Sequence, residues 1–432
     1  MSDITIRQGF KYLLRPGAKQ AALLRRFAGC RRFVWNKALA ELQARHERGE
    51  AYANHHETRK WLTTWRNSEE FGFLKEAPVH ALQATLIDLD ASFQRFFKKQ
   101  GGHPKFQRKG KGDSFRETDV ACFRVDQAGS RIRLPKLGWI RYHNSRDLAG
   151  AARNLTVSCD ALGWHVSVQT ERAEQPIPTS TAIGAGDRGV ANFLATAEGA
   201  LVAPLNAHKQ ALHKLRRYQR ACARKVEAQK RAMGIAGPVP KGMKLPVSNR
   251  LNKARVRLAN INAKIARSRL DFLHKLSHGL AARYAVFVLE DLRVGNMSRS
   301  ASGTEDNPGA NVKQKSGLNR SILDQGWSEF ARQVGYKLEW RGGRLILIDP
   351  RNTSRTCACC GYTDEKNRKG EAFHCLACGH ADHADVNAAK NILAAGHAVL
   401  AGNGHADVED AAQQGRPVKR QPALETDHVE RL

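Results

Sequence analysis

The stretches TCACCG at residues 356–361 and CLACG at residues 375–379 decide the C-terminal part of this fold. Each stretch holds a C-x-x-C pair next to a glycine, and fourteen residues (361–374) separate the two pairs. The pairs are Cys357 with Cys360 and Cys375 with Cys378. Two pairs with this spacing are typical of a tetrahedral zinc ribbon. Because sulfur would fill all four positions and leave none for water, we expect the zinc to be structural.

The other cysteines do not extend this pattern. Cys359 lies inside the first pair, but the two-residue gap that lets Cys357 and Cys360 converge on one ion leaves it out of the ligand set. A redox pair or chance clustering is the alternative explanation of the cysteine spacing. The remaining four cysteines are scattered, and we interpret them as small buried apolar residues; they are Cys30, Cys122, Cys159 and Cys222.

The charge of the chain indicates a polyanionic partner. Its 432 residues include 71 Lys and Arg against 41 Asp and Glu, which gives a net charge of +30. This excess favours nucleic acid as the partner, and the length predicts two or three domains. A membrane is not expected, because no run of about 18 apolar residues is present and the opening MSDITIRQGF lacks a signal sequence. We expect a cytoplasmic, nucleoid-associated protein without disulfides.

The N-terminal part predicts a small β domain interrupted by helices. Apolar residues at even positions over 3–14 indicate a strand with one buried face. Spacings of three and four residues from Leu23 to Leu42, and again from about Pro78 to Lys99, indicate helices. Strands and a hairpin then follow up to about residue 175.

A basic, glycine-rich loop covers residues 98–113, with the sequence KKQGGHPKFQRKGKGD. Glycine lets the backbone approach a phosphate and the cationic side chains supply charge, so phosphate contact is one interpretation. A solvated linker is the other. The candidate nucleic-acid-binding residues are Lys98, Lys99, Lys105, Arg108, Lys109 and Lys111.

An α/β pattern begins near residue 181, after the linker EQPIPTS. Residues 206–283 hold 20 Lys or Arg and only two acids, Glu227 and Asp271, on two helical segments. Such an excess repels itself unless a polyanion neutralises it, so we expect nucleic-acid contact here. The segment 401–432 has no periodicity and is expected to be a disordered tail.

Three acidic residues lie where a strand is expected to end or a helix to begin. Asp187 follows the apolar start of IGAGDRGVANFLAT, Glu290 ends AVFVLE, and Asp385 opens ADVNAAKNIL. Each alone is weak evidence, because acids at helix N-termini are common. Together, in a basic α/β protein, they fit phosphodiester cleavage by two Mg²⁺ ions, which needs carboxylates converging from separate elements.

Four ordered motifs, together with YLLRPGAKQAALLRRFAGCRRFVWNKALAEL near the N-terminus, resemble the TnpB proteins of bacterial insertion sequences. The motifs are IGAGDRGVANFLAT, VLEDLRVGNM, TSRTCACCGYTD and HCLACGHADHADVNAAKNIL. The resemblance covers the whole chain and implies an RNA-guided DNA endonuclease related to the type V CRISPR effectors. It implies that Asp187, Glu290 and Asp385 bind the catalytic Mg²⁺ ions.

The resemblance also implies a multidomain α+β architecture. A wedge-type β barrel is expected from 1–16 and 101–175, with a helical recognition lobe at 17–100 inserted into it. A RuvC-like, RNase H-type nuclease domain is expected from 181–350 and 381–400, with the four-cysteine zinc ribbon at 351–380 inserted into it. The implied partners are a guide RNA from the same locus and double-stranded target DNA next to a short motif, and a monomer is expected.

Two departures from the family pattern concern the site. Gly186 stands before the first aspartate where the family usually has an aliphatic residue, and Ala185 where glycine is common. Glycine weakens a strand end, so Asp187 could be loosely held. Near the third acid, Asp382 is the alternative to Asp385, which is preferred because Asn387 anchors the motif.

Two other functions share the expected fold. One is an RNA-guided DNA-binding protein or repressor without cleavage, which would be free to lose its carboxylates. The other is a DNA transposase or resolvase that acts without RNA, which co-purifying RNA would distinguish. The three acids favour the enzyme.

Overall fold

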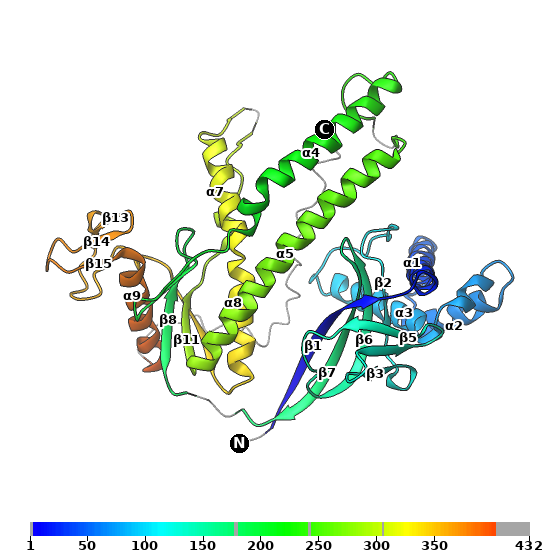
Figure 1. The fold of residues 1–432 in the computed structure, drawn as a ribbon, viewed down its shortest axis with the longest axis horizontal. Helices are drawn as coiled ribbons and strands as arrows, with labels where there is room; N and C mark the ends of the chain where they lie inside the picture. Colours follow the sequence, from blue (N-terminus) through cyan, green and yellow to red (C-terminus); the bar gives the residue numbers. More distant parts are fainter. Residues whose placement is uncertain (1–2, 177–179, 241–242, 305, 403–432) are drawn as a thin grey trace. The chain divides into compact units, whose positions relative to one another are not determined.

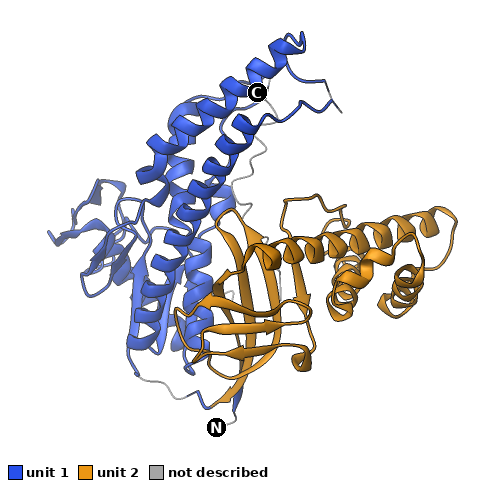
Figure 2. Cartoon of the chain, turned by 45° about the vertical axis from the view of Figure 1, so that its right-hand side comes forward, with its two compact units in different colours: residues 1–4, 175–432 blue, residues 5–174 orange. Residues whose placement is uncertain are grey.

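The computed structural model describes residues 3–176, 180–240, 243–304 and 306–402. The chain forms two compact units, one of residues Thr5–Glu174 and one of Met1–Ile4 with Gln175–Leu432, shown in two colours in Figure 2. Residues 403–432 of the expected tail lie outside the described residues. In the described part of the chain, no helix is long and apolar enough to cross a membrane.

The unit of residues 5–174 is built on a seven-stranded sheet in the order β2-β6-β7-β1-β5-β4-β3. Its strands are β1 (Ile4–Arg15), β2 (Ser114–Glu117), β3 (Arg124–Asp126), β4 (Arg131–Leu134), β5 (Gly138–His143), β6 (Ala151–Asp160) and β7 (Gly163–Glu174). On β1 the even-numbered Phe10, Tyr12 and Leu14 are buried, which confirms the predicted N-terminal strand. The long pair β6–β7 is the hairpin that the sequence indicated.

Helices pack on this sheet through one shared apolar core. They are α1 (Ala18–Glu47), α2 (His55–Asn67) and α3 (Val79–Phe97), with the short 3-10 helices η1 (Gly72–Glu76) and η2 (Val120–Cys122). Leu24, Phe27 and Val34 on α1 are buried at helical spacing and join the core that includes Phe115 of β2. The two predicted helices are confirmed as α1 and α3.

The basic loop between α3 and β2 is fastened to α1. Asn36 donates from Nδ2 to the Gln107 carbonyl oxygen at 3.0 Å and accepts from the Gln107 N–H at 2.7 Å. Trp35 donates from Nε1 to the Lys105 carbonyl oxygen at 3.0 Å. The backbone of this loop therefore has fixed partners, while its cationic side chains remain exposed.

The second unit contains a five-stranded sheet in the order β10-β9-β8-β11-β12. The strands are β8 (Ile183–Asp187), β9 (Leu194–Thr196), β10 (Leu201–Val202), β11 (Val286–Glu290) and β12 (Arg344–Ile348). Strands β8, β11 and β12 are parallel, whereas β9 and β10 are antiparallel to their neighbours. The sheet is therefore mixed, as in an α/β domain.

Helices cover both faces of this sheet. Phe287 and Leu289 of β11 join the core formed with α5 (Asn249–Arg283) and α8 (Trp327–Glu339). Val288 of the same strand joins a separate core with Ile392 of α9 (Ala384–Leu400). Successive side chains of a strand point to opposite faces, so α5 and α8 lie on one face and α9 on the other; Figure 1 shows this layering.

Helix α4 (Ala207–Ala232) pairs with α5 as a long hairpin, seen in Figure 1. A narrow apolar seam of its own joins the two helices, with Leu215 and Cys222 of α4 against Leu258 of α5. Helices α6 (Val294–Met297) and α7 (Val312–Gln325) follow β11. The buried Asp324 of α7 accepts from the backbone at the start of α4 and from Arg269 of α5, which fixes the base of the hairpin.

The cysteine-rich segment forms a small three-stranded sheet before α9. Its strands are β13 (Arg368–Lys369), β14 (Ala372–His374) and β15 (Ala381–His383), preceded by the 3-10 helix η3 (Glu365–Asn367). They pair antiparallel in the order β13-β14-β15.

Candidate active site and cysteine cluster

Asp187 and Glu290 are the last residues of two neighbouring parallel strands, β8 and β11. Val288 pairs with Ala185, and the same register two residues further on places Glu290 level with Asp187. Residues 185 and 288 both face α9, so alternation puts Asp187 and Glu290 on that same face. Both carboxylates therefore lie at the carboxyl edge of the sheet, on the side that α9 covers.

Asp385 reaches the same place from α9. It lies in the first turn of this helix, which packs against β8, β9, β11 and β12. Its backbone N–H is capped by His383 Nδ1 at 3.2 Å. All three predicted acids are thus brought to one edge of the sheet from three separate elements.

Both burial and the neighbouring acids affect the pKa of Asp187. Burial, followed by repulsion from Glu290 and Asp385, raises the pKa of Asp187 to about 7, against the opposing attraction of Arg368 and Arg188. Burial also raises the pKa of Glu290. Neighbouring carboxylates repel one another when ionised, so a bound cation stabilises them.

The three acids are nevertheless more spread than a cage around one ion. Among the described residues, His, Cys, Asp and Glu ligand atoms lie within 4.8 Å of one another in only two groups of three or more, and neither group includes these acids. A wider spacing of the carboxylates suits a site with two metal ions about 3.5–4 Å apart, because the carboxylates then surround two ions and not one. The donors are all oxygen, which hard divalent ions prefer.

Side chains that the sequence did not single out complete the site. Thr353 donates from Oγ1 to Glu290 Oε1 at 2.6 Å. Arg368 donates from Nη2 to Asp385 Oδ1 at 2.8 Å, and Asn192 donates from Nδ2 to Asp385 Oδ2 at 3.2 Å. The buried Arg188 donates to the backbone carbonyl of Glu290 and, at 3.3 Å, to that of Trp327.

These partners had only weak signals in the sequence. Arg188 directly follows Asp187, and Thr353 lies in the motif TSRTCACCG, but neither position alone indicates contact with Glu290. Arg368 lies in the spacer between the cysteine pairs, where basic residues are common. Its approach to Asp385 depends on how the cysteine-rich segment folds back on α9.

Asp382, the alternative third acid, has other partners. Lys390 Nζ lies 2.7 Å from its Oδ2, and His380 Nε2 lies 3.8 Å from it. Against the opposing effect of burial, the Lys390 hydrogen bond holds the pKa of Asp382 below its ordinary value. Asp382 therefore pairs with Lys390 of α9, whereas the charge of Asp385 affects the pKa of Asp187.

Gly186 meets a steric requirement of β8, and its expected loosening of Asp187 stays a prediction. A Cβ atom at this position would lie 2.5 Å from Leu194 Cδ1 and 3.3 Å from Phe287 Cζ. Both side chains are fully buried. The absence of a side chain therefore lets β8 pack closely against its neighbours beside Asp187.

The four expected cysteines form one cluster. The sulfurs of Cys357 and Cys378 are 3.7 Å apart and those of Cys360 and Cys375 are 3.6 Å apart. A tetrahedral ion with metal–sulfur distances of about 2.3 Å has sulfur–sulfur edges of about 3.8 Å. The cluster could therefore hold a metal ion. Cys359 is exposed and outside the cluster, as expected.

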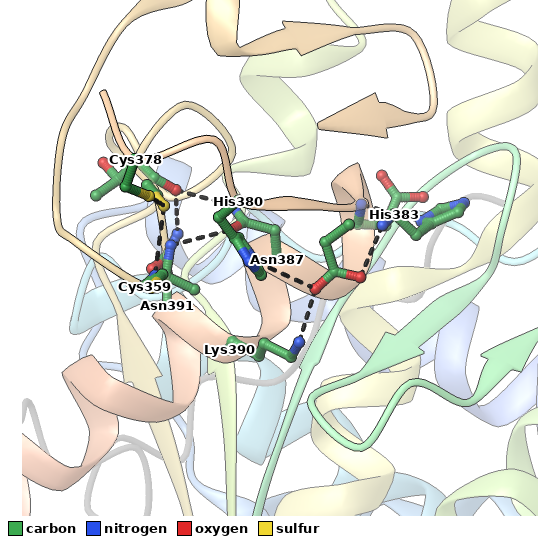
Figure 3. A network of polar contacts seen from close by, with 12 residues as sticks. Cys359, Cys378, His380, His383, Asn387, Lys390 and Asn391 are labelled. Carbon is green, nitrogen blue, oxygen red and sulfur yellow. Dashed lines mark hydrogen bonds and ion pairs between the residues drawn. The ribbon is translucent and has the colours of Figure 1, made fainter. Parts of the chain in front are cut away.

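Hydrogen bonds tie the cysteine-rich segment to α9, as Figure 3 shows. Asn387 is fully buried, accepts from the Ala358 N–H at 2.9 Å and donates to the Thr356 carbonyl at 2.8 Å. Asn391, one turn further on, donates to the Thr353 and Thr356 carbonyls at 2.8 and 2.7 Å. The first cysteine pair and the helix that carries Asp385 are therefore held together.

The interpretation of the scattered cysteines is correct for two of the four. Cys30 and Cys222 are buried, but Cys122 and Cys159 are only half-buried. Cys122 belongs to the second group of potential metal ligands, with His80 and Asp119. The six candidate residues of the basic loop are all exposed and stay a prediction.

Fold and site together define an α/β protein with carboxylates gathered at its sheet edge and an adjoining cluster of four cysteines that could hold a metal ion. Three family models match the chain: a "Helix-turn-helix domain" at 1–51, a "Probable transposase" at 165–301 and a "Cas12f1-like, TNB domain" at 327–392. Within the range of the first model, residues 4–47 form the strand β1 and one long helix, α1.

Relatives match over nearly the whole chain. The protein named "Putative RNA-guided DNA endonuclease InsQ" of Escherichia coli K12 is 42% identical over 96% of this chain and 97% of its own. A Streptomyces pristinaespiralis protein named "Putative RNA-guided DNA endonuclease" is 30% identical over 99% of each chain. This chain therefore belongs to the TnpB family, which the sequence motifs had indicated.

A solved structure supports the fold. The Cas12f1 chain of a complex with single-guide RNA and target DNA aligns with a TM-score of 0.51 at 13% identity, covering 90% of this chain and 99% of that one. At this identity the likeness concerns the fold alone.

Proposed function

We propose that this protein is an RNA-guided, Mg²⁺-dependent DNA endonuclease of an insertion sequence. It would cut double-stranded target DNA next to a short motif, as a monomer loaded with a guide RNA from the same locus. The observation that carries the proposal is the convergence of Asp187, Glu290 and Asp385 at one sheet edge, with the pKa of Asp187 raised to about 7 by burial and by the other two acids. The relatives' names agree with this activity.

The sheet order supports a RuvC-like, RNase H-type nuclease domain. The first strand of the domain, β8, is central, and the parallel β11 is its direct neighbour. The first two acids therefore end adjacent strands, and Asp385 on α9 covers the same edge. On this proposal the seven-stranded sheet with α1–α3 is the wedge and recognition part, and the protein works at the nucleoid.

The chain's own residues have distinct parts in the proposed reaction. Bound Mg²⁺ would supply an activated water and stabilise the leaving oxygen of phosphodiester hydrolysis. Asp187, Glu290 and Asp385 would hold the ions. Thr353 orients the Glu290 carboxylate, and Asn192 orients that of Asp385. The Arg368 guanidinium offsets negative charge on Asp385.

The four-cysteine cluster is proposed to hold structural zinc. Its sulfur–sulfur distances of 3.6 and 3.7 Å suit Zn²⁺, and four thiolates leave no open position for water. The hydrogen bonds of Asn387, two residues beyond Asp385, then hold α9 against the first cysteine pair. In this proposal zinc braces the site and takes no part in the chemistry.

The proposal is tested by expressing the chain together with its native flanking DNA. We expect the purified protein to carry a defined RNA and to cut a plasmid matching the variable end of that RNA in Mg²⁺. Asp187→Ala should abolish cleavage but leave RNA and target binding intact. Cleavage that survives removal of the RNA would indicate a transposase or resolvase, and target binding without any cleavage by the natural chain would indicate a binding protein.

A further inference from the structure

A second group of potential metal ligands lies in the unit of residues 5–174, outside the sites described above. His80 Nε2 or Nδ1, an Asp119 carboxylate oxygen and Cys122 Sγ all lie within 4.8 Å of one another. His80 is in the first turn of α3, whereas Asp119 caps the 3-10 helix η2, just beyond β2, and Cys122 is the last residue of η2. All three side chains are half-buried. Two distant segments of the chain therefore supply nitrogen, oxygen and sulfur donors to one place.

The distances match the edges of a tetrahedral zinc site. His80 Nε2 lies 3.6 Å from Asp119 Oδ2, and Cys122 Sγ lies 3.4 Å from the same oxygen. Zinc–ligand distances of about 2.0–2.3 Å give nitrogen–oxygen edges of about 3.3–3.5 Å and sulfur–oxygen edges of about 3.5–3.7 Å. The third edge, between His80 and Cys122, is within 4.8 Å, so a bound geometry is reached by side-chain movement that brings these two closer together.

A buried carboxylate beside the group gives an independent indication of a missing cation. Glu117 is 1% exposed, and neither Oε1 nor Oε2 has a hydrogen-bond partner. Burial raises the pKa of Glu117, whereas the His80 imidazole and the nearby backbone N–H groups of Asp119 and Thr118, which do not reach hydrogen-bond geometry, act to lower it. The charge of Glu117 also acts on Cys122. A buried carboxylate without a partner is costly, and native structures usually pair it or bind a metal there.

The strand geometry explains why Glu117 faces this group. Phe115 and Glu117 are buried and alternate with half-buried positions on β2, so both point to the face on which α3 packs. Phe115 joins the apolar core. Glu117, at the end of the strand, is near enough to His80 and Cys122 for its charge to interact with theirs. With Asp119 it makes two carboxylates against one imidazole, and a divalent ion would offset this excess.

We propose that His80, Asp119 and Cys122 form a second metal site for a zinc-type divalent ion. The negative charge of Glu117, beside the site, would help to balance the charge of the ion. The mixed nitrogen, oxygen and sulfur donors favour zinc over Mg²⁺. In the metal-free chain the Cys122 thiol donates to Asp119. On binding, that proton leaves to solvent and the thiolate becomes a ligand. The ion would then clip the start of α3 to the end of β2.

Zinc stoichiometry of the full-length chain tests the proposal. Protein loaded with Zn²⁺ and desalted should hold two ions per chain, one in the four-cysteine cluster and one here, measured by plasma mass spectrometry. His80→Ala and Cys122→Ser should each hold one ion. Cys159→Ser, at another half-buried cysteine of the same unit, should keep two. One ion in the natural chain, or two in both ligand variants, would overturn the site.

A second measurement needs no variant and so does not depend on variant folding. Zn²⁺ should slow alkylation of Cys122 by iodoacetamide by about tenfold or more, because a metal-bound thiolate is protected. Cys159 on the same chain is the internal reference, and Mg²⁺ should protect neither. Equal alkylation of Cys122 with and without Zn²⁺ would contradict the proposal.

Discussion

At the scale of single residues, Asp187 makes the fold sensitive to pH. A carboxyl whose pKa is about 7 when folded and about 3.9 when unfolded binds more protons in the folded state between these values. Without Mg²⁺, the free energy of unfolding should therefore fall as pH rises from about 4 to about 7, by at most about 4 kcal/mol. Asp187→Asn should remove this loss and be more stable than the natural chain above pH 7, measured by urea unfolding.

Asp382→Asn is the matched control for this prediction. Its carboxylate forms an ion pair with Lys390, and its pKa is held below the ordinary value. The sign is opposite, so neutralising Asp382 should cost stability above about pH 4, by about 1 kcal/mol. Chelator must be avoided in these measurements because it would also remove the zinc that we propose for the cysteine cluster. Identical pH profiles for the natural chain and Asp187→Asn would show that neither burial nor the neighbouring acids raise the pKa of Asp187 in the fold.

Residue identities at the site were predictable only where the sequence carries strong local patterns. Asp187 and Glu290 end short apolar runs, and Asp385 precedes a helical pattern. Arg368 and Thr353 have no such pattern, because they lie in or beside the cysteine-rich segment, whose course past the acids depends on tertiary packing. The steric need for glycine at 186 is not predictable for the same reason, because it arises from the position of Leu194 in the packed sheet.

At the scale of elements, the contact between the cysteine-rich segment and α9 is a testable joint. Asn387 is fully buried, so Asn387→Ala would remove its hydrogen bonds with the half-buried Ala358 N–H and the Thr356 carbonyl, and losing a buried partner costs about 1–3 kcal/mol. We expect the free energy of unfolding to fall by about that amount. Because Asp385 is two residues away, guided cleavage should also fall about tenfold or more, since small misplacements of catalytic groups are costly.

Asn252→Ala is a suitable control for the joint, because Asn252 is exposed on α5. It should change stability by less than about 0.5 kcal/mol. Zinc content should stay unchanged in both variants, since neither asparagine is a ligand. Full cleavage activity in a destabilised Asn387→Ala protein would show that α9 holds Asp385 without help from the cysteine-rich segment.

Periodicity predicted the elements well where one face is buried. Strand β1 and helices α1 and α3 each carry a regular apolar pattern, and each lies within a few residues of its prediction. The faces of the five-stranded sheet were not predictable, because β11 is buried on both sides and its sequence VFVLE is almost continuously apolar. Only the packing of α9 on the sheet shows which residues of β11 share a face with Glu290.

At the scale of the whole molecule, charge is distributed to suit a polyanion. The hairpin of α4 and α5 buries only a narrow apolar seam and carries most of its Lys and Arg exposed to solvent. Elsewhere, several exposed arginines already pair with acids, among them Arg7, Arg48 and Arg131. Unpaired, solvent-facing cations are the ones that gain most from a phosphate backbone.

This difference predicts which charges set the salt dependence of nucleic-acid binding. Arg216, Arg220 and Arg224 are exposed at four-residue spacing on α4. Changing all three to Gln should weaken binding to a DNA duplex of arbitrary sequence and make the slope of log K against log salt shallower by about 2–3, because each lost phosphate contact contributes about 0.9. Changing Arg7, Arg48 and Arg131 to Gln removes the same charge from positions already neutralised, so the slope should change by less than about 1. Equal effects of the two triple variants, measured by fluorescence anisotropy over a salt series, would mean that net charge alone governs binding and that the α4–α5 hairpin is only a solvated face.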